Sequence, residues 1–332
     1  MKKIISVIIA AAMAVSICAC GSAAKSAAAT AEGKGISIVT TIFPEYDWVM
    51  DVLGDNPANA EVTMLLDNGV DLHSYQPSAQ DIVKISDCDL FIYVGGESDE
   101  WVNDALKEAT NKDMTVINLL DVLGTNVKEE EVVEGMQAEE EEEHEGKDGD
   151  EEEVEYDEHV WLSLRNASTI VKSISEAIVK IDPDNKETYE KNTADYVDKL
   201  NALDKEYDTM VSGASIKTVL FGDRFPFRYL VDDYALSYYA AFVGCSAETE
   251  ASFETITFLA KKVDELGLPA VMTIEGKDHR IAETIVENTA SKDAKILIMD
   301  SMQATTAEDV KNGKTYLNIM KDNLDVLTQA LK

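Results

Sequence analysis

The sequence predicts an α/β protein of two lobes, each with a mainly parallel sheet flanked by helices, joined by one long rigid helix. Short β-rich apolar runs alternate with helical patterns from residue 36 to the end of the chain, which is typical of parallel sheets covered by helices. The alternation starts again after a long helical run at residues 185–211. About 300 residues follow the N-terminal apolar stretch, enough for two domains of ordinary size.

The first 20 residues have the features of a lipoprotein export signal. Two lysines precede an apolar run that is too short to span a bilayer, and a small residue precedes Cys20. We therefore expect Cys20 to be lipidated and to anchor the protein to the membrane on the extracytoplasmic side, at the cell surface. Simple secretion with ordinary cleavage is the alternative. Residues 21–35, rich in Ala, Ser, Gly and Lys, are expected to form a flexible tether.

The charge of the chain excludes one class of partner. The net charge is −35 and the pI is about 4.3, so the surface would repel nucleic acid. Much of the acidity lies in residues 129–158, where dense like charge predicts a mobile loop, either a solvated insertion or a cation-gathering segment. Outside the signal, Cys88 and Cys245 show no Cys-x-x-Cys spacing, and we expect them to be small buried side chains.

The first lobe is expected at residues 36–183. A Ser-x-x-Asp pattern at Ser78 resembles a capping box and predicts a helix start. The predicted strands are 36–43, 62–66, 90–94 and 114–119, and the predicted helices are 44–54, 78–86, 99–109 and 163–181.

A linking helix is expected within residues 184–212, because aromatic and apolar residues recur there at spacings of three, four and seven. At 1.5 Å per residue it would be roughly 40 Å long and act as a strut along both lobes. The second lobe, 213–332, has predicted strands beginning at 218 and at 237–243, 270–274 and 295–299, with helices at 227–234, 253–266, 279–289 and 315–331.

Two of the four histidines lie in distinctive turns. His73 is in a loop between the second strand and a helix, and His159 directly follows the acidic segment. Ligands of open α/β sheets bind beyond the carboxyl ends of strands, where Asp223 and Glu275 are expected. We therefore expect the two imidazoles and carboxylates of the second lobe to hold one divalent transition metal between the lobes.

At these motifs the chain resembles the zinc and manganese receptor lipoproteins of ATP-driven (ABC) importers, a metal-specific cluster of solute-binding proteins. The resemblance runs from about Ile36 to Lys332, apart from the acidic segment. The matching motifs, in order, are Gly69 to Pro77 around His73, Gly95 to Trp101, Asp157 to Leu162 around His159, and Ser246 to Ser252.

The resemblance implies four metal ligands: His73, His159, a third residue after the first strand of the second lobe, and a fourth in a later loop. Where zinc-binding relatives usually have a third histidine, this chain has Asp223. Glu275 is the choice for the fourth ligand, with Asp278 and His279 as alternatives. Leu72 and Glu158 stand where many relatives have proline.

Such a donor set suits Zn²⁺, and with higher coordination number also Mn²⁺ or Fe²⁺. We favour zinc as the transported ligand. The resemblance implies a non-enzymatic, monomeric receptor that captures the ion and delivers it to an ABC permease. A zinc hydrolase would need an open coordination position, and no His-Glu-x-x-His helix or Gly-x-Ser-x-Gly turn is present. A surface adhesin is the third interpretation.

Overall fold

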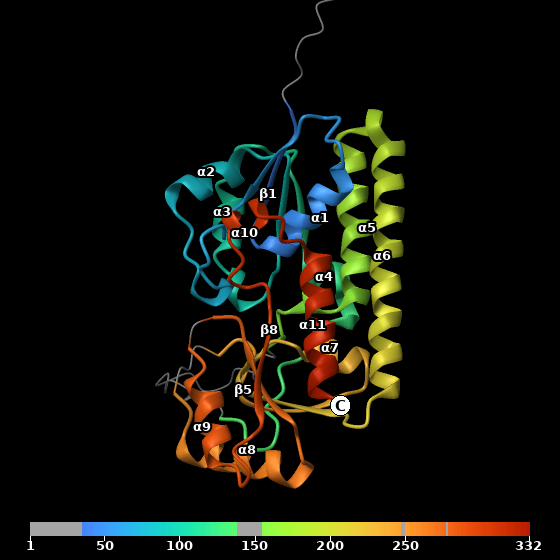
Figure 1. Ribbon diagram of the computed structural model, residues 1–332. Helices are drawn as coiled ribbons and strands as arrows, with labels where there is room; N and C mark the ends of the chain where they lie inside the picture. The colour runs from blue at the N-terminus through green and yellow to red at the C-terminus, as the bar shows by residue number, and fades with distance from the viewer. Residues whose placement is uncertain (1–34, 138–154, 247–249, 277) are drawn as a thin grey trace, which may run out of the picture. The chain divides into compact units, whose positions relative to one another are not determined.

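Strands and helices alternate through both halves of the chain, and each half builds its own four-stranded sheet (Figure 1). The computed structural model describes residues 35–137, 155–246, 250–276 and 278–332. The predicted signal, lipidated Cys20 and the tether up to residue 34 therefore lie outside the described residues, as do the middle of the acidic segment and residues 247–249 of the Ser246 to Ser252 motif. Residues Gly35–Lys332 form one compact unit, which is described below.

The first sheet has the strand order β2-β1-β3-β4 and is entirely parallel. Its strands are short, and the two central ones are mostly buried: β1 (Ser37–Thr40) and β3 (Leu90–Tyr93) in the centre, with β2 (Glu61–Met64) and β4 (Thr115–Asn118) at the edges. The helices around it are α1 (Phe43–Leu53), α2 (Ala79–Asp87), α3 (Val102–Lys107), the short α4 (Leu119–Leu123) and α5 (Leu164–Ile181). The predicted capping box begins α2, where Ser78 accepts a hydrogen bond from the backbone of Asp81.

The long helix α6 (Lys186–Gly213) connects the lobes and lies beside α5 (Figure 1). Its apolar stripe is buried as the spacing predicts, with Tyr189, Leu200 and Tyr207 fully covered. It contacts α1 in the first lobe and α11 in the second, over roughly 42 Å of helix. Because both lobes pack on the same helix, α6 acts as a strut.

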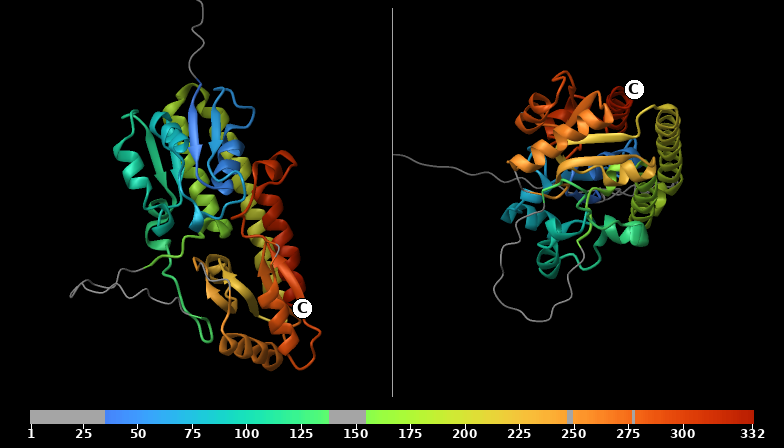
Figure 2. Two further views of the ribbon diagram at one scale, coloured as in Figure 1. Left: turned by 90° about the vertical axis from the view of Figure 1, so that its left-hand side faces the viewer. Right: turned by 90° about the horizontal axis from the view of Figure 1, so that it is seen from below.

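The second sheet is also parallel, with the order β6-β5-β7-β8. Its strands are coloured from yellow to orange in Figure 2. Its strands are β5 (Thr218–Phe225), β6 (Ser237–Val243), β7 (Ala270–Ile274) and β8 (Lys295–Met299). Its helices are α7 (Arg228–Asp233), α8 (Phe253–Leu266), α9 (Arg280–Asn288), the short α10 (Ala307–Lys311) and α11 (Tyr316–Ala330). These two sheets, their helices and the linking helix confirm the predicted fold class.

One strand differs from expectation in a way that affects the site. β5 continues to Phe225, and its pairing with β6 shifts register between Phe221 and Arg224. Asp223 therefore lies within the strand, at this irregularity, instead of beyond its end. The bulged backbone lets β5 continue although Gly222 breaks the apolar pattern.

The acidic segment also differs from the predicted mobile loop, because both of its ends are ordered. Glu129 and Tyr156 form an antiparallel bridge, and the amide of Asp157 donates to Lys128 O at 2.9 Å. Asp157 and Glu158 are 3% and 2% exposed, although a run of like charge predicts solvation. Each of these two carboxylates is buried because it has a specific hydrogen-bond partner, described below.

Trp161 joins the two lobes next to the turn that holds His159. Its indole Nε1 donates to Ser301 O at 2.9 Å, and its own carbonyl accepts from Tyr316 Oη at 2.6 Å. One hydrophobic cluster runs through both lobes around these residues, and a smaller one lies beneath α8 and α9. None of the helices in the described ranges has the length and apolar composition needed to cross a membrane.

Candidate metal centre

His73 is presented by a 3₁₀ turn, Leu72–Ser74. Asp71 caps this turn, because its Oδ1 accepts a hydrogen bond from His73 N at 3.0 Å. Leu72 is buried in the first-lobe core and anchors the turn from below. The His73 side chain is 9% exposed, so the imidazole lies almost entirely inside the protein.

The position of His159 is fixed by the same kind of hydrogen bond, from its own backbone N–H to an aspartate two residues earlier. Asp157 Oδ1 accepts from His159 N at 2.9 Å, two residues along the chain, and a 3₁₀ turn (Val160–Leu162) follows. The same carboxylate oxygen lies 3.0 Å from His159 Nδ1. The ring is fully buried, between those of His73 and Trp161.

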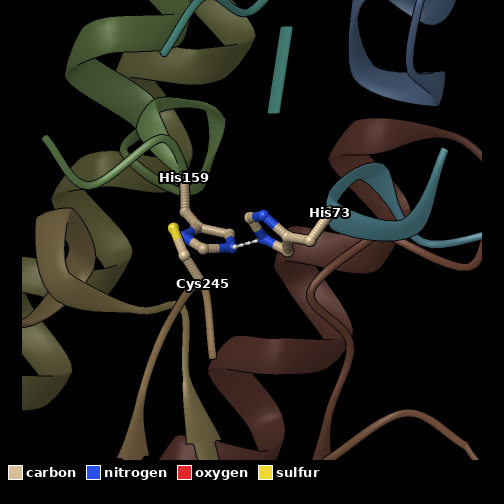
Figure 3. Close-up of side chains that lie close together, drawn as sticks. All are labelled: His73, His159 and Cys245. Carbon is tan, nitrogen blue, oxygen red and sulfur yellow. Dashed lines mark hydrogen bonds between the residues drawn. The ribbon is translucent and has the colours of Figure 1, made fainter. Parts of the chain in front are cut away.

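The two rings point their Nε2 atoms at each other, 3.2 Å apart (Figure 3). On the far side of each ring, Nδ1 faces oxygen: Asp157 for His159, and for His73 the Ser98 Oγ at 2.8 Å with Glu158 Oε2 at 3.6 Å. These oxygens favour a proton on each Nδ1, which leaves a lone pair on each Nε2. Two lone pairs at this distance repel, so the geometry requires a proton or a metal ion between them.

The two imidazoles differ in their affinity for a proton. Burial, together with the neighbouring His159, lowers the pKa of His73 to about 3. Burial also acts to lower the pKa of His159, but the ion pair and hydrogen bond with Asp157 outweigh it and the pKa is raised. In the absence of metal, His159 therefore binds a proton more readily than His73 does.

Cys245 is the second-lobe residue that joins this pair. It follows β6, and Figure 3 shows it beside the His159 ring. One ligand atom from each of His73, His159 and Cys245 lies within 4.8 Å of the others, the one such group of three or more metal-binding side chains among the described residues. Burial, with nearby Glu130, raises the pKa of the thiol. Glu130 Oε1 also accepts from Cys245 N at 3.1 Å and so fixes this backbone.

Cys245 is absent from the ligands predicted from the sequence, because a thiol without Cys-x-x-Cys spacing is expected to be a small buried side chain. The available signal was its position: it lies just past the carboxyl end of a predicted strand, where ligands of parallel sheets bind.

Asp223 and Glu275 lie elsewhere and have partners of their own. Asp223 Oδ2 accepts from the Thr273 hydroxyl and from Ile274 N, and its Oδ1 accepts from Arg224 N. Glu275 accepts from Ser301 N at 2.6 Å and from Ser301 Oγ at 2.7 Å. Neither belongs to the cluster of His73, His159 and Cys245.

The two alternatives for the fourth ligand also have local partners. Asp278 is exposed and paired with Arg280, and His279 Nδ1 lies 3.2 Å from the Thr273 hydroxyl. The metal-binding roles predicted for Asp223, Glu275, Asp278 and His279 stay predictions.

Arg224 crosses between the lobes beside the site. Its Nη2 donates to Asp71 Oδ2 at 2.6 Å, so this guanidinium from β5 holds the carboxylate that caps the His73 turn. Burial would raise the pKa of Asp71, but Arg224 holds it below its usual range. The pair ties the position of His73 to the second lobe.

This fold, with two imidazoles and a thiol between its lobes, defines a metal-binding protein of the two-lobed solute-binding class. The model of the ZnuA family, described as the periplasmic component A of a zinc-uptake complex, matches residues 38–330. The chain belongs to this family, which confirms the predicted family resemblance and the prediction of a binding protein that is not an enzyme.

The relatives carry names of the same kind. The chain is 33% identical over 304 residues to the "High-affinity zinc uptake system protein ZnuA" of Bacillus subtilis, covering 91% of this chain and 90% of the relative. It is 29% identical over 301 residues to the "Zinc-binding protein AdcA" of Streptococcus pyogenes, covering 90% of this chain but 56% of the relative. The chain thus spans little more than half the length of the streptococcal relatives.

Solved structures show the same architecture. The Zn(II)-bound ZnuA-like domain of Streptococcus pneumoniae AdcA superimposes with a TM-score of 0.68 at 29% identity, covering 90% of this chain and 99% of that domain. The metal-dependent lipoprotein YcdH of Bacillus subtilis gives a TM-score of 0.70 at 29% identity, covering 89% of this chain and 99% of that protein.

Proposed function

We propose that this protein is an extracytoplasmic zinc receptor that captures Zn²⁺ and delivers it to the permease of an ABC importer. The observation that carries the proposal is the pair of imidazole Nε2 atoms facing each other at 3.2 Å. In tetrahedral zinc sites with Zn–N bonds of 2.0–2.1 Å, two ligand nitrogens lie about 3.3–3.4 Å apart. The two rings are thus spaced for one zinc ion without further movement.

His73, His159 and Cys245 are the protein ligands in this proposal. Zinc accepts thiolate readily, and a coordinating thiol loses its proton outright, which reverses the effect of burial on Cys245. A thiolate also favours Zn²⁺ over Mn²⁺, which prefers oxygen donors. The choice of zinc over manganese therefore follows from a ligand other than the predicted Asp223.

The groups behind the two imidazoles suit capture of a cation. Asp157 and Glu158 each place a carboxylate behind one ligand histidine, which raises the electron density at Nε2 and fixes the tautomer. Both imidazoles are almost sealed from solvent. A bound ion would therefore be shielded from competing water and chelators.

Delivery and anchoring rest on the family and the N-terminal sequence. A component of a zinc-uptake complex works with a permease, and a streptococcal relative is named a zinc-binding lipoprotein. Together with the signal-like residues 1–20, this supports attachment through a lipid on Cys20, which keeps the receptor close to the permease.

Zinc content and affinity test the proposal. We expect protein purified without chelator to contain about one zinc per chain by elemental analysis, as a single tetrahedral site requires. His73→Ala and His159→Ala should each abolish tight binding in competition with a chromophoric chelator, while Asp223→Asn tests the predicted carboxylate ligand. His279→Ala is the matched histidine control outside the cluster. Wild-type affinity in both His73 and His159 variants would refute the assignment.

A further inference from the structure

The irregular part of β5 presents an arginine to the first lobe. The strand shifts register between Phe221 and Arg224, and such an irregularity changes the direction in which a side chain points. Asp223 fixes the backbone here, because its Oδ1 accepts from Arg224 N at 2.9 Å and its Oδ2 accepts from Ile274 N at 3.3 Å in the neighbouring β7. The arginine side chain is 18% exposed, so it extends from a rigid strand into a largely covered place.

The guanidinium of Arg224 binds the chain on both sides of the metal centre. Its Nη2 donates to Asp71 Oδ2 at 2.6 Å, and its Nη1 donates to the carbonyl of Ser246 in a longer hydrogen bond of 3.4 Å. Asp71 lies two residues before His73, and Ser246 directly follows Cys245. One planar group therefore joins the segments that carry a proposed ligand from each lobe.

The segment before the histidine turn of the first lobe has little support of its own. Residues 67–70 are exposed, and the start of the segment is fixed by one backbone hydrogen bond, from Ala307 N to Asp67 O at 2.7 Å. A segment with few buried contacts opens at a low cost in free energy. At its other end, Asp71 uses one carboxylate oxygen to cap the turn and the second to bind Arg224. The ion pair is thus a main restraint on this segment.

We propose that Arg224 is a positioning residue that sets how long zinc stays bound. Its ion pair with Asp71 keeps the His73 turn next to the segment of Cys245, and the ion leaves after this pair breaks. The inference rests on the proposed function and concerns the rate of zinc release, which that function leaves open. Since a permease must receive the ion, the contact that limits release is also the one that docking has to break.

A role through position can be separated from a role through charge. The Arg224→Gln variant leaves the carboxylate of Asp71 without its counter-charge, and through charge alone it would attract Zn²⁺ and slow release. The Asp71→Asn variant leaves an unpaired guanidinium, which would repel the ion and speed release. Asparagine still caps a turn, so His73 N keeps an acceptor. Charge therefore predicts effects of opposite sign, whereas positioning predicts faster release in both variants.

Stopped-flow transfer of zinc from the full mature chain to an excess of chromophoric chelator measures release. We expect Arg224→Gln and Asp71→Asn each to speed release by roughly 10- to 100-fold, as loss of a supporting partner does in other metal sites. The double variant should differ from the faster single variant by less than about twofold, because both changes remove one interaction. Arg224→Lys keeps the charge without the planar fork and should be intermediate. Added salt should speed release from wild type but not from the double variant.

Arg165→Gln is the matched control. Arg165 also joins the lobes, since its Nη1 donates to Asp233 O at 2.9 Å, but it binds neither ligand segment, and we expect wild-type release. Thermal unfolding in EDTA confirms that each variant folds, and if Arg224→Gln does not fold, Arg224→Lys and Asp71→Asn decide.

Three results would overturn the inference: wild-type release from Arg224→Gln, slower release from it, or equal acceleration by Arg165→Gln. Each of these leaves the receptor assignment intact. Absence of zinc binding in the wild-type protein overturns the receptor assignment instead.

Discussion

Asp99 should make the metal-free protein less stable as pH rises. It ends the short 3₁₀ helix Glu97–Asp99, is 2% exposed, and accepts one hydrogen bond, from Gly95 N at 3.0 Å. Its Oδ1 has no partner in the part of the chain that the structure describes. Burial, with the nearby carboxylate of Glu158, raises its pKa from 3.8 to about 7.

The sign of the effect follows from proton binding. Between pH 4 and pH 7 the native state keeps a proton on Asp99 that the unfolded chain has lost, so stability present at low pH is lost as pH rises through about 7. A shift from 3.8 to about 7 corresponds to at most about 4 kcal/mol at pH 8, at 1.36 kcal/mol per pH unit. An asparagine at this position would be neutral at every pH and would bring an N–H donor to this carboxylate-rich place.

We therefore expect Asp99→Asn to unfold at higher urea than wild type at pH 8, with a gain of about 2–4 kcal/mol, and to exceed wild type by a smaller margin near pH 5. Urea unfolding in EDTA, followed by circular dichroism, measures this difference. Asp104→Asn, with a side chain 85% exposed, is the control and should change stability by less than about 0.5 kcal/mol. A variant less stable than wild type at pH 8 would show that the carboxylate is ionised and needed.

Two further predictions concern zinc. Asp157→Ala should weaken zinc binding by roughly 10- to 100-fold in chelator competition, because His159 Nδ1 loses its partner; an affinity equal to wild type would show that Asp157 does not position the ligand. Zinc affinity should fall as pH falls through the pKa of His159, which lies above its ordinary value of 6.5, and Asp157→Asn should move this fall to lower pH. Calorimetry in two buffers of different ionisation enthalpy measures the released protons, and a pH-independent affinity between about pH 5 and pH 8 contradicts the proton competition.

The elements that the sequence predicts best carry their own end signals. Ser78 with Asp81 begins α2, and Ser252 caps α8, whose bounds match the prediction. Strands β6, β7 and β8 also match, because apolar β-branched or aromatic runs end there at turn residues. In these places local residues decide the structure, so a local pattern is sufficient.

The ends of the acidic segment show where local pattern fails. Charge density alone predicts that residues 129–158 are solvated, yet Glu130 accepts from the backbone of Cys245 and Glu158 Oε1 accepts from Ser98 N at 2.9 Å. These partners are 115 and 60 residues away along the chain. A carboxylate with a distant partner cannot be told from a solvated one by its neighbours in sequence.

The same physical distinction separates the two proposed histidine ligands, which the sequence predicts, from the proposed ligand Cys245, which it does not. Both histidines sit in an Asp-x-His turn whose own aspartate accepts the histidine N–H, at 3.0 Å for Asp71 and 2.9 Å for Asp157, so the ligand and its support lie within three residues. The position of Cys245 depends on a carboxylate 115 residues away. Short sequence motifs therefore determine the geometry of the two histidines of the first lobe, whereas tertiary contacts position the second-lobe part of the site. It follows that short motifs can predict the two histidine ligands, whereas a ligand from the second lobe can be found only from its tertiary contacts.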